Sequence, residues 1–167
     1  MAEPVPQRIP ESPDEQLSAA QIATLSGIDF MRGMLAGRLP AAPIARLAGM
    51  RLAEVREGEV VFEAEPRFEH YNPIGSVHGG WFGILLDSAM ACAVMTRLPR
   101  GTGYTTLEYK MNILRPVFES TGRLRAVGRS VHAGRRTATA EGRLEDGAGR
   151  LYATGTTTCM VMELARQ

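Results

Sequence analysis

The chain has 167 residues, of which 44% are hydrophobic and 22% charged. This size and composition fit one globular domain with a sizeable core, and they argue against a disordered, collagen-like or coiled-coil chain. The formal net charge is only +1, so no overall field would attract nucleic acid or an anionic membrane.

Residues 1–43 are expected to form an N-terminal leader and helices. Four prolines within the first 13 residues indicate a loose leader, and the segment lacks the basic start and apolar run of a secretory signal. Ser12 resembles a helix N-cap followed by proline and acids, which predicts a helix to about Leu25. A second short helix after Gly27 is expected to end before Pro40. Its apolar side would carry Phe30, Met31, Met34 and Leu35.

Residues 44–167 are expected to form one α+β domain. Alternating glutamates and apolar residues predict a strand at 57–65, and we expect 44–55 to be its partner strand. Residues 80–98 are apolar nearly all round, so as a helix they must be enclosed by other elements. Four more strands are expected, because β-favouring segments are separated by turn residues. They are 104–115, 121–132, 135–146 and 150–163. One buried helix between early and late antiparallel strands calls for a curved sheet wrapped around it.

The apolar helix is interrupted by Asp87 and falls short of a membrane span, so we expect a cytoplasmic protein. Desolvating an unpaired carboxylate costs several kcal/mol, and Asp is a weak former of helix interiors. Asp87 therefore either bonds to a backbone N–H or to an arginine at an interface, or serves as a nucleophile or general base. We favour the functional interpretation.

His78, Gly79 and Gly80 stand at the start of this helix, where the first N–H groups have no intrahelical acceptor. The glycines leave these donors uncovered, so a carbonyl or oxyanion can approach them closely. A flexible start of the helix is the alternative for the two glycines. His78 would be an acid, a base or a hydrogen-bonding brace, and Asn72 would form a turn or help to hold a substrate carbonyl.

Several other kinds of site are not expected. The three histidines lack metal-ligand spacing, so we expect no metal. The sequence has no GxSxG elbow, no Walker loop and no complete dinucleotide-binding loop. Cys92 and Cys159 lie too far apart for a CxxC motif and are expected to be buried, reduced thiols. Trp81, with Tyr71 and Phe82, lines an aryl pocket or packs in the core.

The run NPIGSVHGGWFGILLD, from Asn72 to Asp87, is followed by GYTTLEYKMNILRPV and VHAGRRTATAEGRL. Together these segments resemble the PaaI-type thioesterases of the hotdog fold, in the 4-hydroxybenzoyl-CoA thioesterase-like superfamily. The resemblance covers roughly residues 44–163. It implies a curved antiparallel sheet around one long hydrophobic helix and hydrolysis of an acyl-CoA to a free acid and CoA, without a further cofactor. The acyl group stays open between aryl, arylacetyl and medium-chain groups.

The resemblance also implies roles for individual residues. Asn72 and Gly79 would orient and polarise the thioester carbonyl, and His78 would brace the loop. Asp87 would be the nucleophile or the base for water. A hydroxyl on the next strand would assist this acid, and Thr106 aligns best, with Thr105 as the neighbouring alternative.

Substrate contacts are expected from Gly80 and Trp81 and, for the phosphates of CoA, from Arg135 and Arg136. Ordinary exposed arginines are the alternative for that pair. Because the hotdog fold serves several functions, a non-catalytic acyl-CoA sensor or regulator and an acyl-thioester dehydratase remain as alternatives. Asp87 together with the HGG motif favours hydrolysis.

Gly80 and Asp87 lie about 10 Å apart along the helix axis. One thioester would not easily reach both from the same chain, so we expect a homodimer in which each site takes its donors from one chain and its acid from the other. The resemblance agrees and implies that two such dimers often pair into a tetramer.

Overall fold

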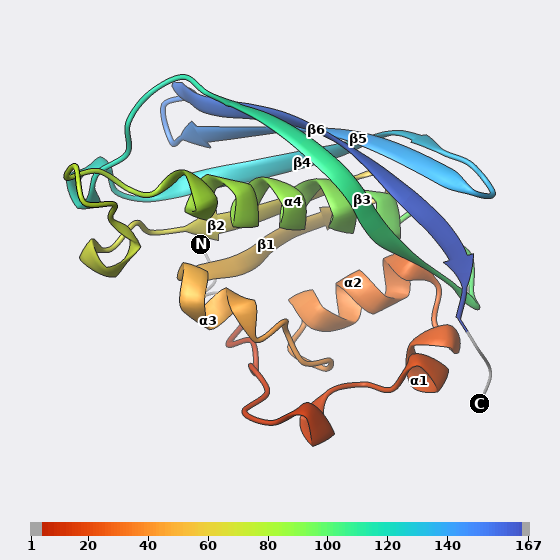
Figure 1. The fold of residues 1–167 in the computed structure, drawn as a ribbon. Coiled ribbons are helices and arrows are strands. Elements are labelled where there is room, and N and C mark those ends of the chain that lie inside the picture. Colours follow the sequence, from red (N-terminus) through yellow and green to blue (C-terminus); the bar gives the residue numbers. More distant parts are fainter. Residues whose placement is uncertain (1–4, 165–167) are drawn as a thin grey trace.

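The computed structural model describes residues 5–164 and contains a six-stranded antiparallel sheet that curves over the long helix α4 (Gly79–Met95) (Figure 1). The strand order is β1-β2-β4-β5-β6-β3, so β1 and β3 form the edges. The strands are β1 (Met50–Arg56), β2 (Glu59–Ala64), β3 (Thr102–Ile113), β4 (Leu124–Ala133), β5 (Thr137–Asp146) and β6 (Leu151–Glu163). This arrangement confirms the α+β hotdog fold expected from the sequence.

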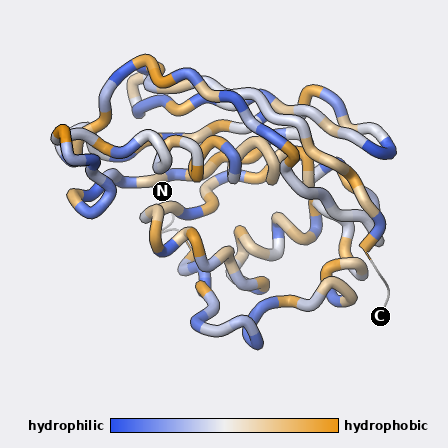
Figure 2. The backbone as a smooth tube through the Cα atoms, viewed as in Figure 1, coloured by the Kyte–Doolittle hydropathy of each residue, from blue (hydrophilic) through white to orange (hydrophobic). Residues whose placement is uncertain are grey.

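Helix α4 is enclosed on both sides, as its apolar sequence requires. The sheet covers one side and the N-terminal helices lie on the other (Figure 1). Side chains such as Leu85, Leu86 and Met90 have no exposed surface. Figure 2 shows the hydrophobic colours of this helix in the middle of the molecule. None of the helices in the described range is long and apolar enough to cross a membrane.

A row of glycines lets the sheet approach α4 closely. Gly128, Gly142 and Gly155 are direct cross-strand neighbours on β4, β5 and β6. A Cβ on Gly128 would collide with the backbone of Ala89, and one on Gly142 would lie 2.8 Å from Met90 Cγ. The row therefore lets α4 sit deep in the concave face of the sheet.

Four short helices lie in the N-terminal part of the chain, and two more follow in loops. They are η1 (Pro13–Glu15), α1 (Ala19–Ala23), α2 (Gly27–Leu35), α3 (Ile44–Ala48), η2 (Phe68–His70) and η3 (Glu119–Thr121). The second helix expected from the sequence is confirmed as α2, which ends before Pro40.

Two sequence predictions in this region are wrong. The helix expected from Ser12 to about Leu25 is split, because Ser18 caps a separate helix by accepting a hydrogen bond from the Gln21 N–H while the Gln21 side chain bonds back. The strand expected at 44–55 begins only at residue 50. Its first part is helix α3, which ends at Gly49 in the left-handed conformation, with φ of 61°.

The N-terminal part packs onto the same core as the sheet. Met31 of α2 is 1% exposed and belongs to one cluster with α4. Gln7 extends the leader along edge strand β1, where its side-chain amide donates to the Leu52 carbonyl at 2.7 Å and accepts from the Leu52 N–H at 3.1 Å. The boundary expected between residues 43 and 44 stays a prediction, and residues 1–4 of the expected leader lie outside the described residues.

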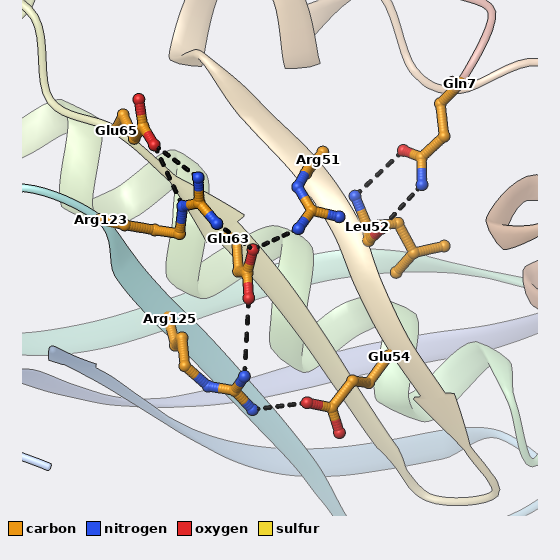
Figure 3. A network of polar contacts seen from close by, with 8 residues as sticks. All are labelled: Gln7, Arg51, Leu52, Glu54, Glu63, Glu65, Arg123 and Arg125. Carbon is orange, nitrogen blue, oxygen red and sulfur yellow. Dashed lines mark hydrogen bonds and ion pairs between the residues drawn. The ribbon is translucent and has the colours of Figure 1, made fainter. Parts of the chain in front are cut away.

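The outer face of β1, β2 and β4 carries a lattice of ion pairs (Figure 3). Glu63 on β2 pairs with Arg51 on β1 and with Arg125 on β4, which are its direct cross-strand neighbours. Arg125 also bonds to Glu54 at 2.7 Å. These pairs are partly buried, since the Glu63 side chain is only 14% exposed. The arginines of this face are therefore compensated by acids and do not form a free cationic patch.

Candidate active site

Asp87 lies in the third turn of α4, half-buried, and lines a cavity of about 200 Å³. The Thr106 hydroxyl donates a hydrogen bond of 2.9 Å to its Oδ1 atom. Within residues 5–164 this is the one hydrogen bond of the Asp87 carboxylate. Neither an arginine nor a lysine in this range forms an ion pair with it. Within the described residues of this one chain, the carboxylate therefore has neither a backbone N–H nor an arginine as a partner.

Thr106 reaches Asp87 from β3, which contains a β-bulge at the next residue, Leu107. Thr106 pairs with Cys159 on β6 and Glu108 pairs with the preceding Thr158, so Leu107 is the extra residue. The bulge changes the alternation of β3, and both Thr106 and Tyr109 turn toward α4. Thr105 is exposed on the other side. Of the two threonines left open by the sequence, Thr106 is the one brought to the acid.

The start of α4 separates the roles of its two glycines. The Gly80 N–H donates to Nδ1 of the N-cap residue His78 at 2.9 Å, so that donor is already used. The Gly79 N–H has no acceptor among the described residues. It is a free donor at the positive end of the helix dipole, where it can bind a carbonyl oxygen. His78 has the geometry of a brace.

Asn72 forms a turn and keeps one donor free. Its Oδ1 atom accepts from the Ile74 N–H at 3.0 Å and the Ser76 N–H at 3.3 Å, and its Nδ2 atom donates to the Ser76 hydroxyl at 3.2 Å. An amide NH₂ carries two protons, so one remains for another acceptor. Asn72 and Gly79 line the same cavity, of about 310 Å³.

The donors and the acid lie in different cavities of one chain. The cavity at Asn72 and Gly79 shares no lining residue with the cavity at Asp87. Gly79 and Asp87 are separated by about 12 Å along the helix axis, since each residue adds about 1.5 Å. One chain therefore presents two half-sites, one with the donors of Asn72 and Gly79 and one with the acid Asp87.

Both half-sites lie beside β3, a free edge of the sheet. A Cβ on Gly79 would contact Ile113, and one on Gly83 would come within 2.7 Å of the Tyr109 hydroxyl. Leu107 and Tyr109 are 57% and 43% exposed, and Ile113 and Leu114 are similarly open. A long edge strand with exposed apolar side chains tends to pair with another strand.

The remaining candidates are placed as follows. Trp81 is 4% exposed, and its indole N–H donates to the Ala48 carbonyl at 2.9 Å, so it packs in the core and lines neither cavity.

Arg135 and Arg136 are exposed in the turn between β4 and β5, and no ion pair involves them within the described part of the chain. Ala138, two residues beyond, pairs with Cys159, which also pairs with Thr106. This turn is therefore at the end of the sheet that lies near Thr106 and Asp87.

Several residues of the Asp87 cavity were not expected from the sequence. Ser88, Cys92, Tyr104 and Met34 line it together with Gln7. Burial raises the pKa of the Cys92 thiol to about 12, with a smaller opposite effect from a hydrogen bond to Tyr104. The thiol is therefore neutral at physiological pH.

The chain is similar in sequence and fold to several known proteins. The family model of the Thioesterase superfamily matches residues 74–153. A phenylacetic acid degradation-related protein from Ralstonia eutropha is 32% identical, with a TM-score of 0.71, over 78% of this chain and 98% of that chain. A mutant of the phenylacetic acid degradation protein PaaI from Thermus thermophilus is 33% identical, with a TM-score of 0.63, over 71% of this chain and 97% of that chain.

A thioesterase from Haemophilus influenzae shares the fold, at 21% identity and a TM-score of 0.66, over 72% of this chain and 82% of that chain. None of the curated proteins compared with the chain matches it.

Proposed function

Because the chain belongs to the thioesterase superfamily, we propose that it hydrolyses the thioester bond of an acyl-CoA and releases a free acid and CoA. The observation that carries this proposal is the position of Asp87. Its carboxylate stands in the middle of a buried helix, is held by the Thr106 hydroxyl, and opens into a cavity. A carboxylate in this position costs stability, and a catalytic role explains why it is there.

Each complete site would form between two copies of the chain. Antiparallel pairing of two β3 edges, centred near Tyr109, would set Ile113 of one copy beside Thr106 of the other. Because Ile113 lies at Gly79 and Thr106 lies at Asp87, the donors of one copy then face the acid of the other. A two-fold axis creates two such sites at once.

In this arrangement the Gly79 N–H and the free Asn72 N–H bind the thioester oxygen, and negative charge develops there as the carbonyl carbon is attacked. Asp87 acts in one of two ways. As a base it takes a proton from water, whose oxygen attacks the carbon; as a nucleophile it forms an anhydride that water then hydrolyses. In both routes the carbon–sulfur bond breaks and CoA leaves as a thiol.

The phosphates of CoA need cationic partners at the mouth of the site. Arg135 and Arg136 lie at the end of the sheet near Asp87. Arg115 lines the cavity at Asn72 and Gly79. The two-fold pairing would bring Arg115 of one copy toward Arg135 and Arg136 of the other. We also propose that the protein is cytoplasmic and assembles as a dimer or as a dimer of dimers.

The test is CoA release by purified protein across a panel of acyl-CoAs, with Asp87→Asn as the decisive variant. Loss of the acid should lower turnover by about 10²- to 10⁴-fold without lowering the melting temperature. Asp14→Asn, the same chemical change on an exposed side chain of η1, is the matched control and should keep wild-type activity. Unchanged turnover in Asp87→Asn would end the catalytic assignment. Tight binding of acyl-CoA without CoA release by the wild type would favour a non-catalytic binding protein.

A further inference from the structure

The cavity at Asp87 adjoins a second, larger cavity of about 440 Å³. Five residues line both and define the neck between them: Met34, Ala41, Ala42, Cys92 and Tyr104. A group that enters beside Asp87 and Thr106 would pass Cys92 and Tyr104 to reach the larger cavity.

The larger cavity lies between two parts of the chain. The leader and the N-terminal helices line one side, with Leu17, Ile22 and Phe30 among its residues. Met95 of α4, Gly103 of β3 and Leu164 line the other side. The family model matches residues 74–153 only, so the first side comes from a part of the chain outside that match.

The walls of this cavity suit a hydrocarbon. No charged side chain lines it within residues 5–164, and its polar side chains are those of Gln16, Tyr104 and Cys92. Burial raises the pKa values of the Cys92 thiol and of the Tyr104 hydroxyl, so both groups are neutral at physiological pH. Burial of apolar surface is the main source of affinity that such walls offer.

The length of the path sets the size of the ligand. From Asp87 to Met95 the path follows α4 for about 12 Å, at about 1.5 Å per residue. An extended chain advances about 1.2 Å per bond, since one residue of three backbone bonds spans at most about 3.6 Å. About ten carbon atoms therefore reach from the thioester to the far wall.

We propose that the two cavities together form a tunnel for the acyl chain, which makes the protein selective for unbranched aliphatic acyl groups of about eight to twelve carbons. This inference rests on the proposed function and names its substrate class. A phenylacetyl group would fill the cavity at Asp87 and leave the larger cavity unused. The N-terminal helices thus act as one wall of the substrate site.

The experiment measures kcat/KM for butyryl-, octanoyl-, decanoyl-, palmitoyl- and phenylacetyl-CoA. Each methylene buried in the tunnel should raise kcat/KM about fourfold, the equivalent of about 0.8 kcal/mol, up to about ten carbons. Ala42→Phe narrows the neck and should lower the value for decanoyl-CoA at least tenfold more than the value for butyryl-CoA. Leu17→Trp, at the far wall, is a second variant that keeps the test possible if Ala42→Phe does not fold. It should also lower the value for decanoyl-CoA more than the value for butyryl-CoA.

Ala148→Phe, an exposed alanine in the turn between β5 and β6, is the matched control and should leave the whole series unchanged. A preference for phenylacetyl- or butyryl-CoA, or equal losses on all substrates in the two tunnel variants, would overturn the tunnel while leaving hydrolysis intact. If no acyl-CoA is hydrolysed, the proposed function fails, and calorimetry with decanoate tests the tunnel separately. Decanoate that binds the wild type more tightly than Ala42→Phe supports it, and absence of binding to the wild type overturns it.

Discussion

Thr106 on β3 and Asp87 on α4 are joined by a hydrogen bond of 2.9 Å, just before the β-bulge at Leu107. The bond fixes one carboxylate oxygen and leaves the other toward the cavity. A hydrogen bond to a charged group is worth about 1.5–3 kcal/mol, so its loss should misplace the acid at a measurable cost in rate.

We therefore predict that Thr106→Val, which keeps the shape but removes the hydroxyl, lowers kcat by about 10- to 100-fold. Thr105→Val, on the exposed side of the same strand, should stay close to the wild type, and Thr106→Ser should restore most of the activity. Steady-state kinetics of the three variants checks this. Equal effects at positions 105 and 106 would contradict the assigned hydrogen bond.

Arg136→Ala should raise KM for an acyl-CoA with little change in kcat, because the side chain would contact the nucleotide and not the reacting atoms. The effect should shrink for an acyl-pantetheine, which lacks the nucleotide. Arg38→Ala, an exposed arginine just after α2, is the control and should leave both KM values unchanged. A KM increase of the same size on both substrates would rule out the nucleotide contact.

Gly128→Ala should destabilise the fold by about 3 kcal/mol or more, because the added methyl group would collide with the backbone of Ala89. This backbone is part of α4 and cannot easily shift away. Gly147→Ala, in the open turn between β5 and β6 with nothing near the added atom, should change stability by no more than about 0.5 kcal/mol. Urea unfolding of both variants gives the comparison. Similar midpoints would show that the glycine row is not needed for the close approach of α4.

Cys92 should be unreactive toward a disulfide reagent at pH 8 in the native protein. Burial raises the pKa of this thiol to about 12 and also raises that of Cys159. Because the folded value lies above the unfolded value of about 8.5, this contribution to stability is complete below that pH and is lost as the pH rises toward 12. Both thiols should react at once in denaturant, and rapid labelling of the native protein would contradict the assignment.

The sequence predicted the elements that depend on strong local patterns. The apolar run around Asp87 defined α4, and alternating residues with turn signals placed all four later strands to within a few residues. The segment 44–48 was mistaken for a strand because its apolar residues fit either period over so short a length. Its Gly49 is a C-cap, which the pattern of the segment alone did not reveal.

The site depends on contacts that no local pattern encodes. The Gly-Gly pair indicated donors at the helix start, but only the position of the His78 ring shows that Gly80 is occupied and Gly79 is free. The bulge at Leu107 puts Thr106 and Tyr109 on the same side of β3, which simple alternation does not predict. The larger cavity forms where the leader and α2 meet α4 and β3, segments distant in the sequence.

The most direct test of a site shared between two chains is subunit mixing. Asp87→Ala and Asn72→Ala, each inactive alone, are combined after dissociation and reassembly in equal amounts. Half of the dimers would be mixed, and each mixed dimer would hold one intact site out of two, so a shared site should restore about a quarter of the wild-type activity per subunit. No recovery of activity, with subunit exchange verified by mass, would show that donors and acid act within one chain and would contradict a shared site.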